Sequence, residues 1–322
     1  MSPTAPALAQ PQPEALPGPP SEPGRCPACG GALGSCESSR YRRCTACRVR
    51  VSLVPEGSYG RDYYYHGASF DQRLAARARE QVAHLKRLEA GLGLGLRPRG
   101  AASRLLELGC GKGFFVEAAL AAGFDARGLD LSAAAIAAGR RRGLGQRLMC
   151  ADARELDPQT VGGGFDLVVA WELLEHVEQP VEFLRSAARL LRPGGWLLGS
   201  TPNGDSPWIG ALGSGWHGFD IPEFHRLYLT AEGFAHVARR AGLDRPSCLS
   251  INERSGLFLL KNTATALARR LWSGPDKLRR GLLAAGLALP HWMLERAAGR
   301  VPGLPGETLL FAAQLGQSPA DR

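Results

Sequence analysis

Short apolar runs alternate with amphipathic stretches along the chain from about residue 103 onward. The runs have the length of strands, and the stretches place apolar residues three and four positions apart, as one face of a helix requires. This alternation predicts an α/β fold with a doubly wound, largely parallel sheet. We expect strands at residues 104–108, 126–129, 147–150, 165–170, 196–200, 246–251 and 308–313, and helices near residues 114–122, 133–142, 181–191 and 231–241.

The overall composition is that of a globular protein. A length of 322 residues allows one large α/β core with additions. Apolar and charged fractions of 44% and 21% exclude a fully disordered or fibrous chain. The longest apolar run, residues 281–290, is much shorter than the roughly 20 residues of a membrane-spanning helix. The net charge of +9 favours anionic partners without choosing among nucleic acid, acidic lipid and phosphorylated substrates.

Two Cys-x-x-Cys pairs, Cys26 with Cys29 and Cys44 with Cys47, lie near the N-terminal end of the sequence. Each pair places two thiolates on one side of a tight turn, and four cysteines suit tetrahedral zinc. Because four thiolates leave no open coordination position, we expect a structural or recognition role. The alternative is unrelated cysteines or two disulfides in an exported chain, which the absence of a secretory pattern in residues 1–24 disfavours.

The segments that flank the central region differ in composition. Eight prolines and no basic residue in residues 1–24 predict a disordered tail. An aromatic cluster precedes an amphipathic helix that is indicated by Leu74, Ala78, Val82, Leu85 and Leu88. The expected domains are the tail over 1–24, a zinc-ribbon-like segment over 25–56, a helical cap over 57–100, the core over 101–254 and 306–316, and a helical insertion over 255–305.

A glycine-rich turn follows the first expected strand of the core. Gly109, Gly111 and Gly113 stand at alternate positions, so the backbone can turn tightly and approach a ligand closely. A dinucleotide site has its third glycine one residue later, where this chain has Phe114. The acidic Glu107 before the turn suits a ligand with a cationic amino group.

Acidic residues also follow the next two expected strands. Asp130, which precedes Leu131, can accept two hydrogen bonds from a ribose diol. Asp152, which precedes Ala153, can accept a hydrogen bond from the exocyclic amine of an adenine. The alternatives are a helix N-cap for Asp130, a position for which Ser132 is better placed, and a solvated side chain for Asp152.

These motifs, in this order and at these spacings, resemble those of class I S-adenosylmethionine-dependent methyltransferases. The resemblance runs from about residue 105 to residue 242 and includes residues 165–177, 190–196 and 201–203. It implies a Rossmann-like seven-stranded sheet whose last strand, at 308–313, is antiparallel. It also implies a site for S-adenosylmethionine formed by Glu107, Gly109, Cys110, Gly111, Gly113, Asp130, Leu131, Asp152, Ala153 and Trp171.

The order of a cysteine-rich segment, an aromatic segment and this core is similar to that of a bacterial subgroup of the family. That subgroup acts in polysaccharide, lipid or secondary metabolism, and ubiquinone-type O-methyltransferases and sugar C-methyltransferases are related to it. Direct in-line methyl transfer depends mainly on alignment and exclusion of water. A general base is needed only where the acceptor must lose a proton.

Two histidines are the candidates for catalysis. Glu172, Glu175 and His176 have the spacing that places three side chains on one face of a short helix. In ubiquinone-type O-methyltransferases a similar pattern is associated with magnesium, although we favour His176 as a packing residue beside the cofactor. His225 lies in an aromatic, glycine-rich segment, residues 205–230, that resembles an acceptor-side lid. His225 is either a general base or substrate contact, or a histidine that caps backbone carbonyls, and Phe224 interrupts the family's Pro-Glu-His pattern there.

Eight basic and two acidic residues lie between positions 261 and 300, interleaved with leucine and tryptophan. This pattern predicts basic amphipathic helices, which cover the sheet edge or the mouth of the site, or alternatively contact a membrane surface. Membrane contact would suit a lipid-linked acceptor and a location at the inner face of the membrane. No recognition pattern for nucleic acid accompanies the charge, so we do not expect a nucleic-acid partner.

The sequence therefore predicts a cytoplasmic S-adenosylmethionine-dependent methyltransferase with a structural zinc ion. We expect its acceptor to be a small-molecule or lipid-linked metabolite, and we favour O-methylation over C-methylation. The alternatives are a non-catalytic zinc-ribbon binding protein on a degenerate methyltransferase fold and an RNA methyltransferase. Retention of Glu107, the three glycines and Asp130 argues against degeneration.

Overall fold

The computed structural model describes residues 24–36, 40–55, 57, 68–94, 102–206, 209, 221–251 and 307–317. Except for Gly24, the predicted disordered tail lies outside these residues, and so does the whole of the predicted basic insertion. So do most of the aromatic side chains of the expected lid, namely Trp208, Trp216, His217 and Phe219. Among the described helices, none combines the length and the apolar character that crossing a membrane requires.

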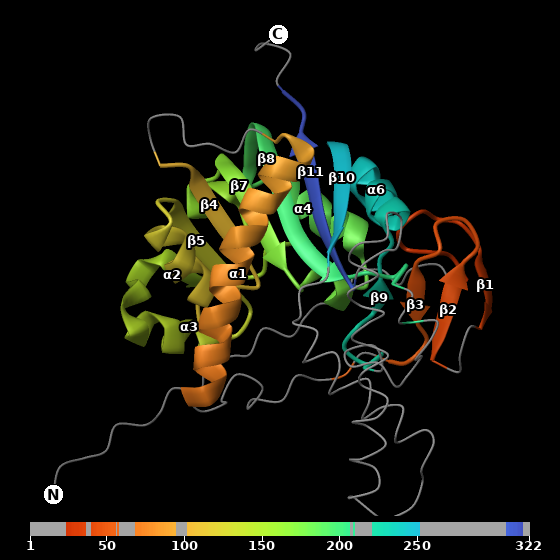
Figure 1. Cartoon of the computed structure of the whole chain (residues 1–322), viewed down its shortest axis with the longest axis horizontal. Coiled ribbons are helices and arrows are strands. Elements are labelled where there is room, and N and C mark those ends of the chain that lie inside the picture. The colour runs from red at the N-terminus through yellow and green to blue at the C-terminus, as the bar shows by residue number, and fades with distance from the viewer. Residues whose placement is uncertain are drawn as a thin grey trace, which may run out of the picture.

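A seven-stranded sheet with the strand order β10-β11-β8-β7-β4-β5-β6 forms the centre of the structure (Figure 1). β4 pairs in parallel with both β5 and β7, so the strand order reverses at β4. β11 pairs antiparallel with β8 and with β10. The doubly wound fold and the antiparallel last strand are thus confirmed. The bounds are β4 (Arg104–Leu108), β5 (Asp125–Asp130), β6 (Leu148–Cys150), β7 (Phe165–Trp171), β8 (Leu191–Pro202), β10 (Leu243–Ile251) and β11 (Thr308–Leu315).

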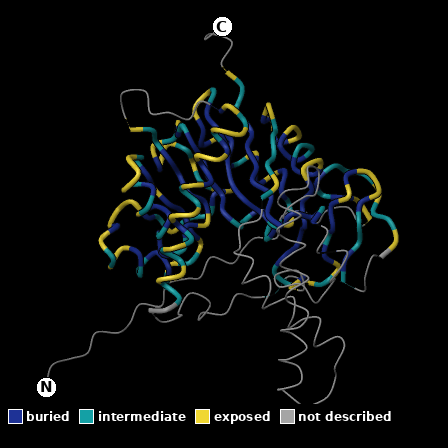
Figure 2. The backbone as a smooth tube through the Cα atoms, in the orientation of Figure 1, coloured by how far each residue is buried: buried dark blue, intermediate teal, exposed yellow. Residues whose placement is uncertain are grey.

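Helices cover both faces of this sheet. Consecutive side chains of a strand point to opposite faces, so each strand contributes to two apolar cores. Leu105 and Leu167 belong to one buried core with α1, α2 and α3. Their neighbours Leu106 and Val168 belong to a second core with α4 and α6. Figure 2 shows the buried strands between these layers. The helices are α1 (Ala68–Leu92), α2 (Phe114–Ala121), α3 (Ala133–Gly139), α4 (Pro180–Ala188) and α6 (Ala231–Arg240).

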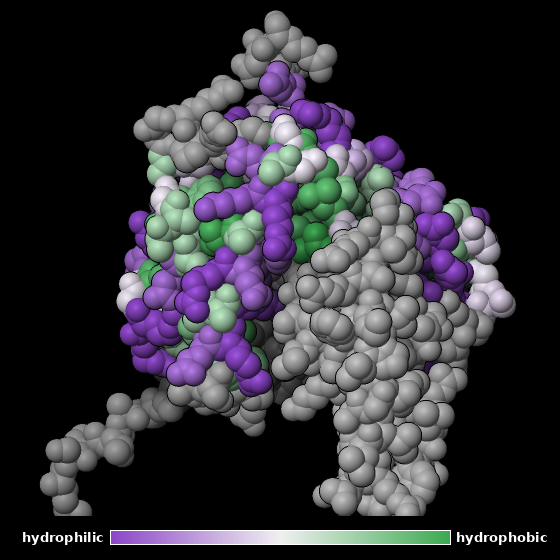
Figure 3. All heavy atoms as spheres, in the orientation of Figure 1, coloured by the Kyte–Doolittle hydropathy of each residue, from purple (hydrophilic) through white to green (hydrophobic). Residues whose placement is uncertain are grey.

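Helix α1 is the amphipathic helix that the sequence predicts. Ala78, Leu85 and Leu88 are buried against the sheet and α2. Hydrophilic side chains follow its outer side on the face shown in Figure 3. The helix therefore packs on α2 and on the strands β10 and β11.

Polar side chains begin two of the other helices. Ser132 accepts a hydrogen bond from the backbone N–H of Ala135, 3.1 Å away, and so is the N-cap of α3. Thr230 accepts one from Gly233, 2.9 Å away, at the start of α6. Wider and tighter helical turns complete the connections, at Arg140–Leu144, Gly145–Arg147, Pro158–Val161 and Leu174–His176.

A second, smaller sheet contains the cysteine pairs. Its strands are β1 (Leu33–Cys36), β2 (Tyr41–Cys44), β3 (Arg50–Ser52) and β9 (Leu227–Tyr228), in that order. The first three form the zinc-ribbon-like segment, and β9 comes from the loop that the sequence assigns to the acceptor side. β3 and β9 lie side by side in Figure 1 and pair antiparallel. The sequence did not predict this fourth strand.

Burial and hydrogen bonds fix the ribbon to the core. The completely buried Val49 belongs to the same apolar core as α4 and α6. Thr230 donates its hydroxyl proton to the backbone oxygen of Cys47, 2.7 Å away. Arg240 at the end of α6 donates to the backbone oxygens of Pro27 and Ala28, at 3.1 and 2.9 Å. The ribbon and the α/β core therefore form one packed unit.

The packing of α6 on the sheet predicts a large effect of one core substitution. Phe234 is completely buried and stacks on Phe311 of β11, with ring centroids 4.7 Å apart. Phe234→Ala should lower the free energy of unfolding by about 3–5 kcal/mol, measured by urea denaturation. The exposed Leu53 provides the control, since Leu53→Ala should change it by less than about 0.5 kcal/mol. Equal effects of the two substitutions would contradict this packing.

Candidate active site

The glycine turn lies at the carboxyl end of β4, where the strand order reverses and ligands of such sheets bind. Gly109, Gly111 and Gly113 have φ angles of +73°, +52° and +74°, which L side chains rarely adopt. A Cβ atom at Gly113 would lie 2.6 Å from Leu144 Cδ1, and one at Gly109 would lie 3.0 Å from Leu173 Cδ1. The backbone conformation therefore favours glycine at all three positions, and the leucine contacts add to this at Gly109 and Gly113.

Asp130, the last residue of β5, joins this turn to the neighbouring strand. Its Oδ2 accepts a hydrogen bond from Gly111 N at 2.7 Å, and its Oδ1 accepts one from Ser132 N at 2.8 Å. Burial raises the pKa of Asp130 above its usual value, although these two hydrogen bonds oppose the increase. Each carboxylate oxygen can accept a further bond, so Asp130 can also hold a ribose hydroxyl. The adjoining Leu131 has an exposed side chain.

Glu107 is a buried carboxyl group beside this turn. Its Oε2 has no hydrogen-bond partner among the described residues. Burial, together with the nearby Asp130, raises its pKa well above the usual value. An unpartnered buried carboxyl oxygen is costly, and a cationic amino group would relieve that cost. Glu107, the bare glycine backbone and Asp130 therefore fit the amino acid and ribose parts of S-adenosylmethionine.

The structure shows the other predicted cofactor residues in contact with neighbouring parts of the protein. Cys110 is buried, and its side chain would contact a Cβ atom at Gly128, so it lies against β5. Asp152, next to the buried Ala153, is held by Arg154 at 2.6–3.0 Å. Burial raises the pKa of Asp152, but these hydrogen bonds outweigh it and leave the pKa below its usual value.

Trp171, the last residue of β7, packs its indole in the core beneath α1. Its ring centroid lies 5.4 Å from that of Phe115 and 6.0 Å from that of His84. Glu107, the glycines and Asp130 therefore lie together at the carboxyl ends of β4 and β5, which form the cofactor edge. The indole of Trp171 belongs instead to the core between the sheet and the helices α1 and α2. Cofactor contacts by Trp171, Cys110, Leu131, Asp152 and Ala153 stay predictions.

Removal of the Asp130 carboxylate tests this edge. Asp130→Ala should weaken the binding of S-adenosylhomocysteine by about 1–3 kcal/mol, because both the ribose contact and the support of Gly111 are lost. Isothermal titration calorimetry measures this. Asp125→Ala, at the opposite end of β5, should leave the affinity unchanged. An unaltered affinity in the Asp130 variant would remove this residue from the site.

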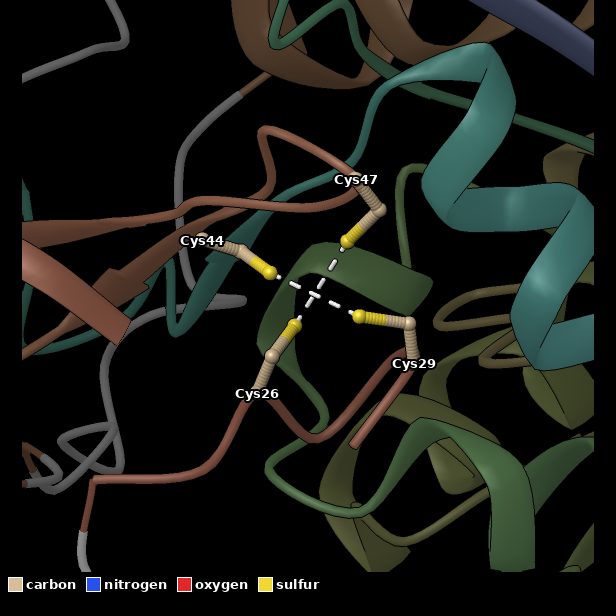
Figure 4. Close-up of side chains that lie close together, drawn as sticks. All are labelled: Cys26, Cys29, Cys44 and Cys47. Carbon is tan, nitrogen blue, oxygen red and sulfur yellow. Dashed lines mark hydrogen bonds between the residues drawn. The ribbon is translucent and has the colours of Figure 1, made fainter. Parts of the chain in front are cut away.

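The four N-terminal cysteines converge on one point (Figure 4). The sulfur atoms of Cys26 and Cys47 are 3.6 Å apart, and those of Cys29 and Cys44 are 3.5 Å apart. Disulfides require about 2.05 Å, whereas tetrahedral zinc with bonds of about 2.3 Å places sulfurs about 3.8 Å apart. The hydrogen bond from Cys47, despite burial, lowers the pKa of Cys26 to about 5. The donor set therefore fits a closed zinc site.

Metal analysis tests this site. The purified protein should contain one zinc ion per chain, and Cys44→Ser should lose it and melt at a lower temperature, because the metal supplies folding free energy to the ribbon. Turnover per folded molecule should fall less than stability. Cys248→Ser, in β10, should keep the zinc. A Cys44 variant with full zinc content would contradict a four-cysteine site.

The short helix expected through Glu172, Glu175 and His176 forms only in part, because the helical turn spans Leu174–His176 and Glu172 precedes it. Glu172 has a φ of +48°, accepts a hydrogen bond from Ser200 at 2.7 Å and pairs with Arg77 of α1 at 3.4 Å. A tight turn then follows, and Glu175 and His176 group instead with His225, with one ligand atom of each within 4.8 Å of the others. One carboxylate beside two imidazoles does not fit magnesium, which prefers oxygen ligands.

His176 and His225 lie together on the side that the sequence assigns to the acceptor. Their rings are edge to face, with centroids 4.9 Å apart. His176 Nδ1 is 3.0 Å from the backbone oxygen of Phe224, which only accepts, so this nitrogen carries a proton. Burial lowers the pKa of His176, although the bond to Phe224 opposes the decrease. His225 Nδ1 is 3.1 Å from the hydroxyl oxygen of Tyr228.

Three contacts of this site have no local signal in the sequence. Lys112 of the glycine turn pairs with Asp71 of α1 at 2.8 Å. Arg77 of the same helix reaches Glu172, and Tyr228 reaches His225. The amphipathic pattern predicts α1 as a cap, but it does not reveal which polar residues meet the core.

Comparisons with known proteins agree with this geometry. A model of the methyltransferase domain matches residues 68–245, over half of the chain. A ubiquinone biosynthesis O-methyltransferase of Acinetobacter baumannii is 26% identical over 186 residues, covering 55% of this chain and 73% of that protein. One from Bordetella pertussis is 31% identical over 156 residues, covering 44% and 62%. The chain belongs to the methyltransferase family and is a class I S-adenosylmethionine-dependent methyltransferase.

Solved structures resemble the chain more distantly. Phosphoethanolamine N-methyltransferase 2 of Haemonchus contortus with S-adenosyl-L-methionine is 19% identical, with a TM-score of 0.48 over 82% of this chain and 62% of that one. A SAM-dependent methyltransferase of Archaeoglobus fulgidus is 17% identical, with a TM-score of 0.46 over 73% and 94%.

Proposed function

We propose that this methyltransferase methylates a hydroxyl group of a small-molecule or lipid-linked metabolite. The observation that carries the proposal is the pairing of His176 and His225 close to the cofactor edge. Leu173, which packs over Gly109, directly precedes the turn Leu174–His176. A nucleophile beside these imidazoles is therefore near the place where the transferable methyl group is expected.

Each residue of the site has a separate part in this chemistry. Bound S-adenosylmethionine supplies a methyl group on a positively charged sulfur. Glu107 binds the amino group and Asp130 the ribose, which fixes the methyl carbon relative to the glycine turn. Lining up the nucleophile with this carbon supplies much of the rate enhancement.

His225 accepts the acceptor's proton at Nε2 as the hydroxyl oxygen bonds to the methyl carbon. S-adenosylmethionine would supply the methyl group and keep the electron pair of the broken carbon–sulfur bond on sulfur, so the products would be S-adenosylhomocysteine and the methyl ether. The imidazolium then releases its proton to water. Neutral imidazole suits this step because its ordinary pKa lies near neutral pH.

Two observations favour oxygen as the nucleophile and a metabolite as the acceptor. The two histidines offer a general base, and a hydroxyl acceptor needs a base more than an amine does. The relatives described above are named as O-methyltransferases of ubiquinone biosynthesis. Contact with a membrane surface through residues 255–305 would suit a lipid-linked acceptor, and that segment lies outside the described residues.

A screen for S-adenosylhomocysteine formation over hydroxylated metabolites and lipid-linked acceptors tests this function. With an active acceptor, His225→Gln should lower kcat/KM by about 10²- to 10⁴-fold through loss of the base. S-adenosylhomocysteine affinity should not change. The matched control is His236→Gln in α6, which should keep full activity. Full activity of the His225 variant would exclude it as the base, and exclusive methylation of carbon or nitrogen would exclude the proposed reaction.

A further inference from the structure

The loop that carries His225 is built into the ribbon. Its strand β9 is the fourth strand of the ribbon sheet, with Tyr228 opposite Arg50 and Leu227 opposite Val51. Ser52 N, at the end of β3, donates to the backbone oxygen of Arg226 at 2.9 Å. A segment near the cysteines thus supplies the hydrogen-bonding edge on which the acceptor-side loop is ordered.

Arg226, the neighbour of His225, fastens three parts of the chain together. Its guanidinium donates to Ser52 Oγ of the ribbon at 3.0 Å and to the backbone oxygen of Pro222 at 2.9 Å. It also pairs with Glu178 at 2.8 Å, and its backbone N–H donates to the backbone oxygen of Glu175 at 2.7 Å. The ribbon, the loop and the turn that carries His176 therefore keep fixed positions relative to one another.

Two buried tyrosines continue this connection to the imidazole. Tyr41 stands in β2, the strand that ends at the predicted ligand Cys44. Its ring lies edge to face against Tyr228, with centroids 5.4 Å apart, and both side chains are almost inaccessible to solvent. The hydroxyl oxygen of Tyr228 then lies 3.1 Å from His225 Nδ1. Strand β2, a ring contact and a hydrogen bond therefore connect Cys44 with the imidazole.

The tautomer of His225 gives this contact a chemical consequence. A neutral imidazole accepts a proton at Nε2 only if its own proton is on Nδ1. The hydrogen bond made by one ring nitrogen sets which nitrogen carries the proton. Tyr228 can accept a hydrogen bond from Nδ1–H, and in that tautomer Nε2 carries the lone pair and not the proton.

We propose that Tyr228 is the positioning residue of His225 and that the metal-loaded ribbon holds Tyr228 through Tyr41 and β3. The ribbon is then part of the acceptor half of the active site, and it does not act as a separate recognition module. The use of His225 as a base rests on the proposed function. The coupling between the ribbon and the imidazole does not depend on it.

Nitrogen-15 NMR of the histidine side chains tests the positioning role without any acceptor. In the full chain, neutral His225 should carry its proton on Nδ1, whereas free histidine in water favours Nε2. Tyr228→Phe keeps the ring but removes the hydroxyl, so the proton should move to Nε2. Tyr41→Phe is the matched control and should keep the Nδ1 tautomer, and His225→Gln assigns the signal. An Nε2 proton in the wild type, or no change in Tyr228→Phe, would overturn the role of Tyr228.

Hydrogen exchange measured by mass spectrometry tests the link to the metal. Chelation of zinc should speed amide exchange in residues 221–230 but leave residues 104–130 and the affinity for S-adenosylhomocysteine unchanged. Readdition of zinc should restore protection. Loss of zinc with no change at 221–230 would overturn the coupling, as would equal deprotection of both regions.

The two proposals fail in different ways. If His225→Gln keeps full activity but the tautomer and exchange results are as expected, only the catalytic use of His225 is wrong. If His225→Gln is inactive and the tautomer is insensitive to Tyr228→Phe, the base stands and the positioning inference fails.

Discussion

The two backbone hydrogen bonds accepted by Asp130 are the constraint on which the cofactor half depends. They hold the glycine turn after β4 against the end of β5, although the turn has a backbone conformation that few residues adopt. A carboxylate in this position therefore supports the fold before it contacts any ligand. The buried Glu107 beside it has one carboxyl oxygen, Oε2, without a hydrogen-bond partner among the described residues, so a ligand can complete it.

The region around His176 and His225 is organised by pairing between distant segments. β3 comes from the ribbon and β9 from the loop after β8, yet together they place His225 beside His176. The shared core around Val49 and α6 makes the ribbon inseparable from the methyltransferase domain. The closed set of four cysteines thus belongs to the architecture of the site, even though it leaves no position for a substrate.

Local patterns predicted the core strands, the glycine turn and the Ser132 cap because each depends mainly on neighbours in sequence. All seven core strands, the glycine turn and the Ser132 cap follow from periodicity and turn chemistry. The expected helix through Glu172 and Glu175 forms only in part, because Glu172 has a positive φ and lies before the turn Leu174–His176. The partnership of Tyr228 with His225 and Tyr41 was not predictable, since it depends on a two-residue strand whose partner is far away in sequence.

The position of β11 has a consequence for how the molecule is made. β8 ends at Pro202, but the strand that covers its edge begins only at Thr308, and β11 also separates β8 from β10. A chain emerging from the ribosome therefore exposes an apolar, unpaired strand edge throughout the synthesis of the intervening segment. The pairing of β8 with β11 forms slowly, because the two strands are far apart in sequence. Biogenesis, more than the stability of the finished sheet, is thus the stage at which this protein is most open to aggregation.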